Sequence, residues 1–279
     1  MNQKYSTPDR DLFRLGLALG NSRKKRIHMK MLDQYIRNGV FPDDFIKPDP
    51  QIYNNEVKIL SENGFNYSVV GSSEYPESFL KLPLPPLLLE FSGNPLLLNG
   101  PSVCIVGSRR ASRRKMEFAK TLGSIMAQNG VTVVSGGAYG IDISAHRGAV
   151  SVNSHTAVFL GGGLLNLYPE RHCDEFLNIS KNGGLLISFL SALSTPRPWS
   201  FLQRNSVMAQ ISDATVICEA ALKSGSLHTA GKAIESEKIL CAVPHSPGCD
   251  LLIKKGAFYS DDPVEMATFL ISKIINKNK

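Results

Sequence analysis

From Pro101 onward, short apolar runs alternate with segments whose apolar residues recur at helical spacing. The runs are rich in valine, isoleucine and leucine and show little polar–apolar alternation, which is typical of strands buried on both faces. They occupy 103–107, 131–135, 156–160, 185–189, 214–220 and 239–244. Because helical stretches separate most of them, the pattern predicts an α/β fold with a mostly parallel sheet and helices on both faces.

The first part of the chain has a different pattern. Residues 8–45 carry leucines at helical spacing, Gly20 can end a helix, and prolines 42, 48 and 50 indicate a linker. A helix, a strand and a proline-rich connection to another strand then precede Pro101. We therefore expect a small all-helical domain over 1–50 and a larger α/β domain over 55–279.

The positive charge is concentrated in one short segment. The 279 residues carry a formal net charge of +7, and residues 109–115 alone hold five cations and no acid. A local basic turn indicates an anionic ligand at one place, whereas a solvated loop is the plain alternative. The RKKR run at 23–26 could touch nucleic acid, but we expect it to be the solvated side of a helical bundle.

Features of export and membrane insertion are missing from the sequence. The N-terminus has no apolar leader, and no window approaches the length and hydropathy of a membrane span. The five cysteines form no CxxC pair, and their odd number fits a reducing compartment. We expect a cytoplasmic protein that has no membrane partner.

Glycine-rich turns follow several of the predicted strands. They include Gly107-Ser108-Arg109, Gly136-Gly137, the GGG at 161–163, and Ser224-Gly225-Ser226. In an open parallel sheet the carboxyl ends of the strands share one edge, and ligands bind outside it. Glycine and serine there expose N–H and hydroxyl donors near helix N-termini, so the turns predict an anion-binding edge that Arg109 and Arg110 reinforce.

A second cluster, RPWSFLQRN at 197–205, places aromatic residues among arginines. Phe201 could stack on an unpaired base while Arg204 and Asn205 hold the backbone. For Trp199 two interpretations stay open: it contacts the ligand, or it closes over the core.

No catalytic or cofactor set is evident. Asp142 and His146 lie four residues apart, the spacing of an ion pair or a general-base dyad, and we expect Asp142 to cap the helix start and His146 to bond to it. GSRRAS is not a GxGxxG fingerprint, and the sequence has no GxxxxGK[ST], HExxH or cysteine–histidine metal set. We predict no cofactor, no metal and no catalytic residue.

Taken in order, the motifs resemble those of the DNA-processing protein A family (DprA, also called Smf). They are YP at 75–76, IVGSR at 105–109, SGGAxGID…AH at 135–146, GGGL…YP at 161–169, FxxRN at 201–205, SDA at 212–214, EAxxxSGSLxTA at 219–230 and AVP at 242–244. The resemblance covers roughly 55–260. It implies an extended Rossmann-like domain that binds single-stranded DNA, forms a homodimer and helps to load the RecA recombinase in natural transformation. It also implies that residues 1–50 resemble a sterile-alpha-motif domain.

The resemblance also assigns residues. Gly107, Ser108 and Arg109 would hold a phosphate; Gly136, Gly137, Ser224, Gly225 and Ser226 would line the same pocket; and Phe201, Arg204 and Asn205 would contact the strand.

The sequence departs from the family pattern at several positions. Tyr139 and Ser206 stand where arginine is usual, and Arg113, Arg114 and Lys115 could compensate for the lost charge. GCD at 248–250 replaces a usual GCN, and we expect no C-terminal winged-helix domain.

We therefore expect a non-enzymatic single-stranded DNA-binding mediator. The alternatives are an enzyme acting on a small nucleotide, such as a phosphoribohydrolase that enlists Glu219 and Asp142 as acids, and a nucleotide-binding sensor.

Overall fold

The computed structural model describes residues 50–275, so almost all of the helical domain predicted over 1–50 lies outside the described residues. Within this range nine strands form one sheet in the order β1-β2-β6-β5-β4-β3-β7-β8-β9. The strands are β1 (Asn66–Val69), β2 (Leu88–Gly93), β3 (Ser102–Val106), β4 (Thr132–Ser135), β5 (Thr156–Phe159), β6 (Leu185–Ser188), β7 (Ala214–Ile217), β8 (Ile239–Ala242) and β9 (Phe258–Tyr259).

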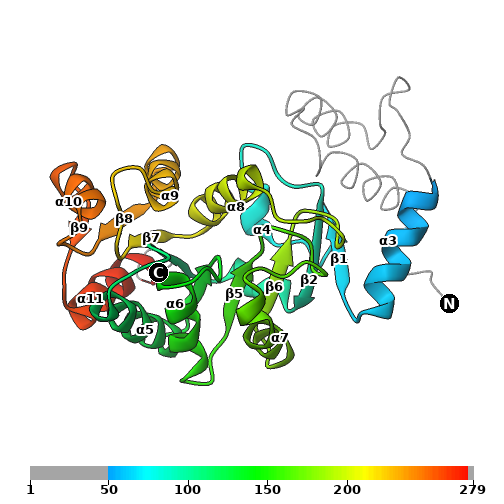
Figure 1. Ribbon diagram of the computed structural model, residues 1–279, viewed down its shortest axis with the longest axis horizontal. Helices are drawn as coiled ribbons and strands as arrows, with labels where there is room; N and C mark the ends of the chain where they lie inside the picture. The colour runs from blue at the N-terminus through cyan, green and yellow to red at the C-terminus, as the bar shows by residue number, and fades with distance from the viewer. Residues whose placement is uncertain (1–49, 276–279) are drawn as a thin grey trace.

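The helices mostly connect consecutive strands (Figure 1). They are α3 (Pro50–Glu62), α4 (Glu77–Leu80), α5 (Arg113–Gln128), α6 (Ile141–Val150), α7 (Cys173–Lys181), α8 (Pro198–Ile211), α9 (Gly225–Glu235), α10 (Pro247–Lys254) and α11 (Pro263–Ile274), with short 3₁₀ turns at Pro95–Asn99 and Glu170–His172.

The sheet is parallel from β6 to β9, whereas the β1–β2 and β2–β6 pairs are antiparallel. β4, β5 and β6 lie on one side of β3, whereas β7, β8 and β9 lie on the other. The order in which successive strands are added thus reverses between β3 and β7, and open α/β sheets bind their ligands at such a position.

Helices cover both faces of this sheet. Val103 and Ile105 of β3 pack into a cluster with α5, α6 and α11, whereas the alternate residues Cys104 and Val106 join a cluster that includes α8, α9 and α10. Successive strand residues point to opposite faces, so a fully apolar run is what a sheet with two covered faces requires. The predicted doubly covered, mostly parallel sheet is confirmed.

The six predicted runs correspond to β3 through β8, and the strand expected after the proline-rich connection is β2. No apolar run in the sequence indicated β9, because a strand of two residues at a sheet edge has no recognisable hydrophobic pattern.

Two carboxyl groups, of Glu56 and Glu90, are buried near each other between α3 and β2. Glu56 of α3 accepts a 2.7 Å hydrogen bond from the backbone N–H of Ala192 through Oε1, and Glu90 of β2 has no exposed surface. Burial raises the pKa of Glu90 well above its ordinary value, and the nearby charge of Glu56 raises it further. Glu90 therefore retains its proton more strongly in the folded protein than in the unfolded chain.

Among the described helices, none combines the length and the apolar character that crossing a membrane requires.

Candidate functional site

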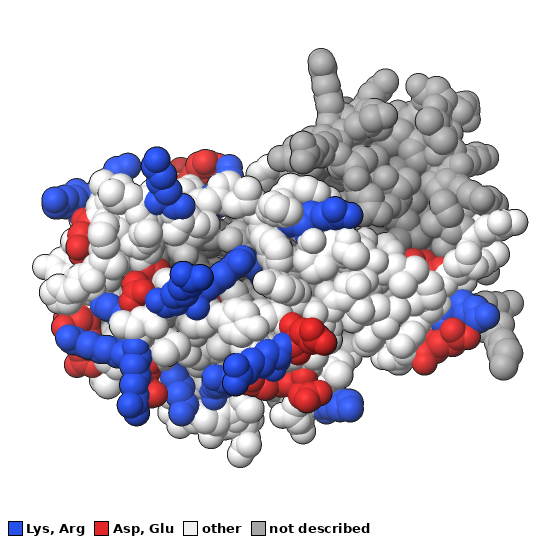
Figure 2. Space-filling model, in the orientation of Figure 1, with Lys and Arg blue, Asp and Glu red and all other residues white. Residues whose placement is uncertain are grey.

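Turns from distant parts of the chain meet at the carboxyl ends of the parallel strands. A shallow hollow there is lined by Arg109, Gly136, Ala138, Tyr139, Tyr168, Pro169, Phe201 and Arg204. The backbone N–H of Ile141 bonds to the carbonyl of Ser108 at 3.3 Å, which joins the turn after β3 to the start of α6. The face drawn in Figure 2 shows basic side chains beside a hollowed part of the surface.

Arg109 and Phe201 form the centre of this arrangement. Arg109 is exposed, and its guanidinium carbon lies 5.4 Å from the centroid of the Phe201 ring. Phe201 is half-buried on the first turn of α8. A guanidinium near an aromatic ring is attracted to the π electrons of that ring and keeps N–H donors for a ligand. The structure thus places Arg109 and Phe201, which come from separate candidate motifs, next to each other.

Arg204 occupies a different place from the predicted one. Its side chain is 3% exposed, and Nη1 donates 2.6 Å hydrogen bonds to the carbonyls of Gly136 and Phe159. The guanidinium carbon lies 5.6 Å from the Phe201 ring. The expectation that Arg204 holds the strand is corrected: the guanidinium supports the turn after β4 and the Phe201 ring from inside the protein.

Asp142 is the charged neighbour of Arg204. Burial raises the pKa of the Asp142 carboxyl, while Arg204 and hydrogen bonds from the backbone N–H groups of Ala138 and Gly107 act in the opposite direction. Burial lowers the pKa of Arg204 to about 10, and Asp142 opposes that shift. Asp142 therefore ties the turn after β3 to the turn after β4.

The predicted Asp142–His146 bond is wrong. His146 is fully buried, and its Nδ1 lies 2.8 Å from Oγ1 of Thr156 on β5. The N-cap position of α6 is occupied by Gly140, and Asp142 lies within the first turn of the helix. Burial lowers the pKa of His146 to about 3, and Arg204 contributes to the lowering, so the ring is neutral at physiological pH. The pair forms no general-base dyad here.

Most of the glycines in these turns have a packing role. A Cβ at Gly136 would collide with the Arg204 guanidinium, and one at Gly137, where φ is +66°, would collide with the Phe176 ring. Both residues are buried, and Gly136, unlike Gly137, is part of the lining of the hollow beside Arg109. Gly225 is different, because it is exposed and a Cβ there would meet only Nδ2 of Asn205, at 3.8 Å.

The start of α9 combines an exposed glycine with an enclosed serine hydroxyl that has no hydrogen-bond partner among the described residues. Ser224 precedes the helix without a capping hydrogen bond, and its Oγ has no partner among the described residues. Ser226 is buried, and Asn205 is half-buried beside Gly225. In the turn after β3, by contrast, the Ser108 hydroxyl already accepts a 3.1 Å bond from the Arg110 N–H. The α9 N-terminus is therefore the more open of these two serine-containing turns.

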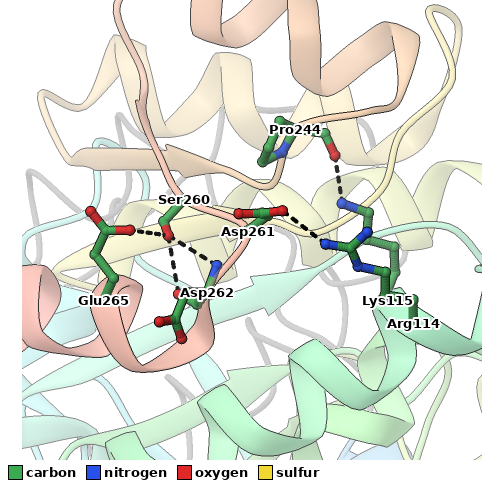
Figure 3. A network of polar contacts seen from close by, with 7 residues as sticks. All are labelled: Arg114, Lys115, Pro244, Ser260, Asp261, Asp262 and Glu265. Atoms are coloured by element: carbon green, nitrogen blue, oxygen red, sulfur yellow. Dashed lines mark hydrogen bonds and ion pairs between the residues drawn. The ribbon is translucent and has the colours of Figure 1, made fainter.

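The basic run divides into two groups. Arg109, Arg110 and Arg113 are exposed and have no ion pair within the described part of the chain. Arg114 pairs with Asp261 at 2.8 Å, and Lys115, 6% exposed, donates to the Pro244 carbonyl (Figure 3). Burial lowers the pKa of Lys115. The prediction that Lys115 compensates for lost charge is corrected: its ammonium joins α5 to the loop after β8.

Two further candidate residues, Trp199 and Ser206, have defined positions. Trp199 is half-buried and packs against the core cluster, which is the second of its two open interpretations. Ser206 donates to the Leu202 carbonyl and lies 2.9 Å from Nε2 of His228, so it links α8 to α9. Over residues 50–275 no group of His, Cys, Asp and Glu is arranged to hold a metal ion.

Tyr168 also lines the hollow, and the sequence alone did not indicate it as a site residue. It is 46% exposed, and its ring centroid lies 5.8 Å from that of Phe201. The signal was present in the YP at 168–169, which closes the segment that starts with the GGG turn. Spacing alone could not show that this segment folds back onto α8.

Comparison with known proteins identifies relatives of this chain. Protein Smf of Escherichia coli K12 is 33% identical over 201 residues, which are 70% of this chain and 54% of that protein. The DNA processing protein DprA of Streptococcus pneumoniae R6 is 32% identical over 193 residues, 66% of each. The chain spans 48% to 59% of the Smf proteins of E. coli, Borreliella burgdorferi and Synechocystis.

Solved structures share the fold. DNA processing protein A of Helicobacter pylori, whose structure describes a unique single-stranded DNA binding mode, is 32% identical with a TM-score of 0.68, covering 75% of this chain and 98% of that one. The crystal structure of the Streptococcus pneumoniae protein has a TM-score of 0.75 at 24% identity, over 91% of this chain and 95% of that one, and supports the fold.

A family model, DNA recombination-mediator protein A, matches residues 66–270. The match begins at the first residue of β1 and extends beyond β9, so it includes all nine strands of the described sheet. The chain therefore belongs to the DNA recombination-mediator protein A family.

Proposed function

We propose that this protein binds single-stranded DNA at the edge between β3 and β7. Arg109 contacts phosphate, and the Phe201 ring stacks on a base. The observation that carries the proposal is the position of the Arg109 guanidinium, exposed and 5.4 Å from an aromatic ring, at the switch point of the sheet. A cation beside a ring matches the two parts of an unpaired nucleotide. The single-stranded DNA binding mode of the Helicobacter pylori relative supports the same ligand.

The start of α5 supports an anionic ligand independently. Its first turn contains three cations and no acidic residue. Arg114 pairs with Asp261 and Lys115 is buried, so Arg113 is the cation of this turn that can meet a ligand. The N-terminus of a helix carries a partial positive charge, so cations there are unfavourable by about 0.3–1 kcal/mol each. A negatively charged partner, such as a phosphodiester backbone, relieves this unfavourable interaction when it binds, and the relief contributes to affinity.

The open α9 N-terminus provides a second place for the backbone. Gly225 is exposed and offers space, and the half-buried Asn205 lies next to it. A polymer with one phosphate per nucleotide can contact Arg109, Arg110 and this turn together.

We infer no enzymatic role. Glu219, a candidate acid, accepts hydrogen bonds from the N–H and the hydroxyl of Ser112, at 3.1 and 3.0 Å, and so fixes the start of α5. Asp142 is enclosed beside Arg204. Incubation with nucleoside monophosphates tests this inference, because release of free base in proportion to protein would establish a phosphoribohydrolase instead.

Family membership supports three finer proposals. The protein works in the cytoplasm, acts as a homodimer, and helps to load RecA onto incoming single strands in natural transformation. Stimulation of the RecA ATPase on strands coated with single-strand-binding protein tests the loading role, and light scattering of the purified chain tests the dimer.

The central test is titration of a fluorescent oligothymidylate by the wild type, Arg109→Ala and Lys120→Ala. Lys120 is also exposed on α5, but it lies beyond the first turn. We expect a marked loss of affinity for Arg109→Ala and wild-type affinity for Lys120→Ala. Equal losses would indicate diffuse charge instead of a site, and no binding by the wild type in dilute buffer would end the proposal.

A further inference from the structure

Three aromatic rings line the hollow around Arg109. Phe201 is half-buried, whereas Tyr168 is 46% exposed and Tyr139 is 40% exposed. Single exposed side chains of this kind are common, but several that line one hollow mark a ligand or partner site. Tyr139 comes from the turn after β4, so it lies on a different segment from both other rings.

The Tyr139 ring is held from below. Its centroid lies 4.8 Å from that of His172, with the rings at 65° to each other. His172 is buried, its Nδ1 lies 3.0 Å from the Gly137 carbonyl, and its ring contacts Phe176 edge-on at 6.0 Å. This row of rings fixes Tyr139 in an exposed position and prevents it from folding onto the core.

The Tyr139 hydroxyl makes no hydrogen bond within residues 50–275, so no polar contact explains why the ring stands at this position. The hollow next to it contains one exposed cation, Arg109. Exposed rings around a single guanidinium suit a ligand that has flat apolar faces and a negative charge, and an unpaired nucleotide has both.

We propose that Tyr139 is a second base-stacking residue, which holds an unpaired base across the hollow from the base at Phe201. The inference rests on the proposed function, since it concerns the same single-stranded ligand. Stacking does not release counterions, so the contribution of Tyr139 to binding is independent of salt, unlike that of Arg109. Within the hollow, Arg109 is thus the salt-sensitive contact, whereas Phe201 and Tyr139 are two salt-insensitive ones.

Three variants separate stacking from packing. Tyr139→Phe keeps the ring, Tyr139→Leu keeps apolar bulk without a ring, and Tyr139→Ala removes both. The probes are a fluorescent oligothymidylate and the same backbone with abasic sites in place of the bases. We expect wild-type binding for the phenylalanine variant and a loss of about five- to tenfold for the other two on oligothymidylate, the lower range of stacking contributions. On the abasic strand all four proteins should bind equally.

The outcomes distinguish this inference from the proposed function. If the wild type binds oligothymidylate and Tyr139→Ala binds it equally well, the second stacking position is absent while the function stands. Equal losses by Tyr139→Ala on both strands would show that the ring only shapes the hollow, which also overturns the inference. A wild type that ignores both strands at low salt overturns the function and the inference together.

Discussion

The carbonyl of Gly136 accepts a 2.6 Å hydrogen bond from the buried guanidinium of Arg204, and the missing side chain of that glycine is what lets the guanidinium fit. A second bond of the same length goes to the Phe159 carbonyl at the end of the neighbouring strand. The charge therefore joins the carboxyl ends of β4 and β5 beneath the hollow. This relationship makes α8 part of the sheet edge on which the candidate site is built.

Gly136→Ala should lower the free energy of unfolding by about 1–3 kcal/mol, the usual cost of overfilling a packed site. The added methyl group would collide with the end of a guanidinium that is fixed by two carbonyls. Urea unfolding followed by circular dichroism measures the change. Gly225→Ala is the matched control, because the space beside it is open, and its unfolding free energy should stay within about 0.5 kcal/mol of the wild type.

Arg204→Met should destabilise the fold by about 3–5 kcal/mol, since it removes one partner of a buried charged pair. The carbonyls of Gly136 and Phe159 lose their donor, and Asp142 loses the positive charge that offsets its burial. Unfolding in urea at neutral pH tests this expectation. A stable Arg204→Met protein with weakened DNA binding would instead assign Arg204 directly to the ligand.

The salt dependence of binding should identify which cations reach the DNA. With about three to five phosphate contacts, log K should fall against log salt with a slope of roughly −2 to −3.5. Arg109→Ala should make that slope shallower by about 0.7, the contribution of one phosphate on a single strand. Arg114→Ala should leave it unchanged, because Arg114 is paired with Asp261. A slope near zero for the wild type would contradict a phosphate-binding site.

Glu90→Gln should remove a pH-dependent loss of stability. The folded pKa of Glu90 is raised above its ordinary value of 4.5. The stability associated with its protonated form is therefore fully present below pH 4.5 and is lost as pH rises through the folded pKa. The free energy of unfolding of the wild type minus that of Glu90→Gln, measured in urea from pH 4 to pH 9, should decrease as pH rises. A difference that does not change with pH would exclude this role for the buried pair.

The sheet was predictable because its signal is local. The run around Val103 and Ile105 has no polar position, and only a strand with two covered faces accommodates that pattern. The edge that carries the site followed from the same reasoning, since glycine turns end neighbouring parallel strands. Family motifs named Arg109 and Phe201 as separate candidates, and the structure supplied their contact.

The direction of individual side chains was not predictable. Arg204 and Lys115 read as solvent-exposed cations, but each finds carbonyl acceptors that come from residues 45 to 129 positions away in sequence. His146 has the spacing of a partner for Asp142, yet Thr156 on the next strand is better placed. In each case the deciding contact is long-range, so charge counts and i,i+4 spacing give no information about it.

Helices α5 and α6 approach so closely at two glycines that a methyl group at Gly123 would meet the Ala145 carbonyl and one at Gly148 would meet the Lys120 carbonyl. Such close backbone contacts leave the two helices little freedom to slide past each other. The turn with Arg109 leads into one helix and the turn with Tyr139 into the other, so the spacing between cation and ring is preorganised before any ligand arrives. Binding then removes little conformational entropy from these two turns, because they are ordered before the flexible polymer arrives.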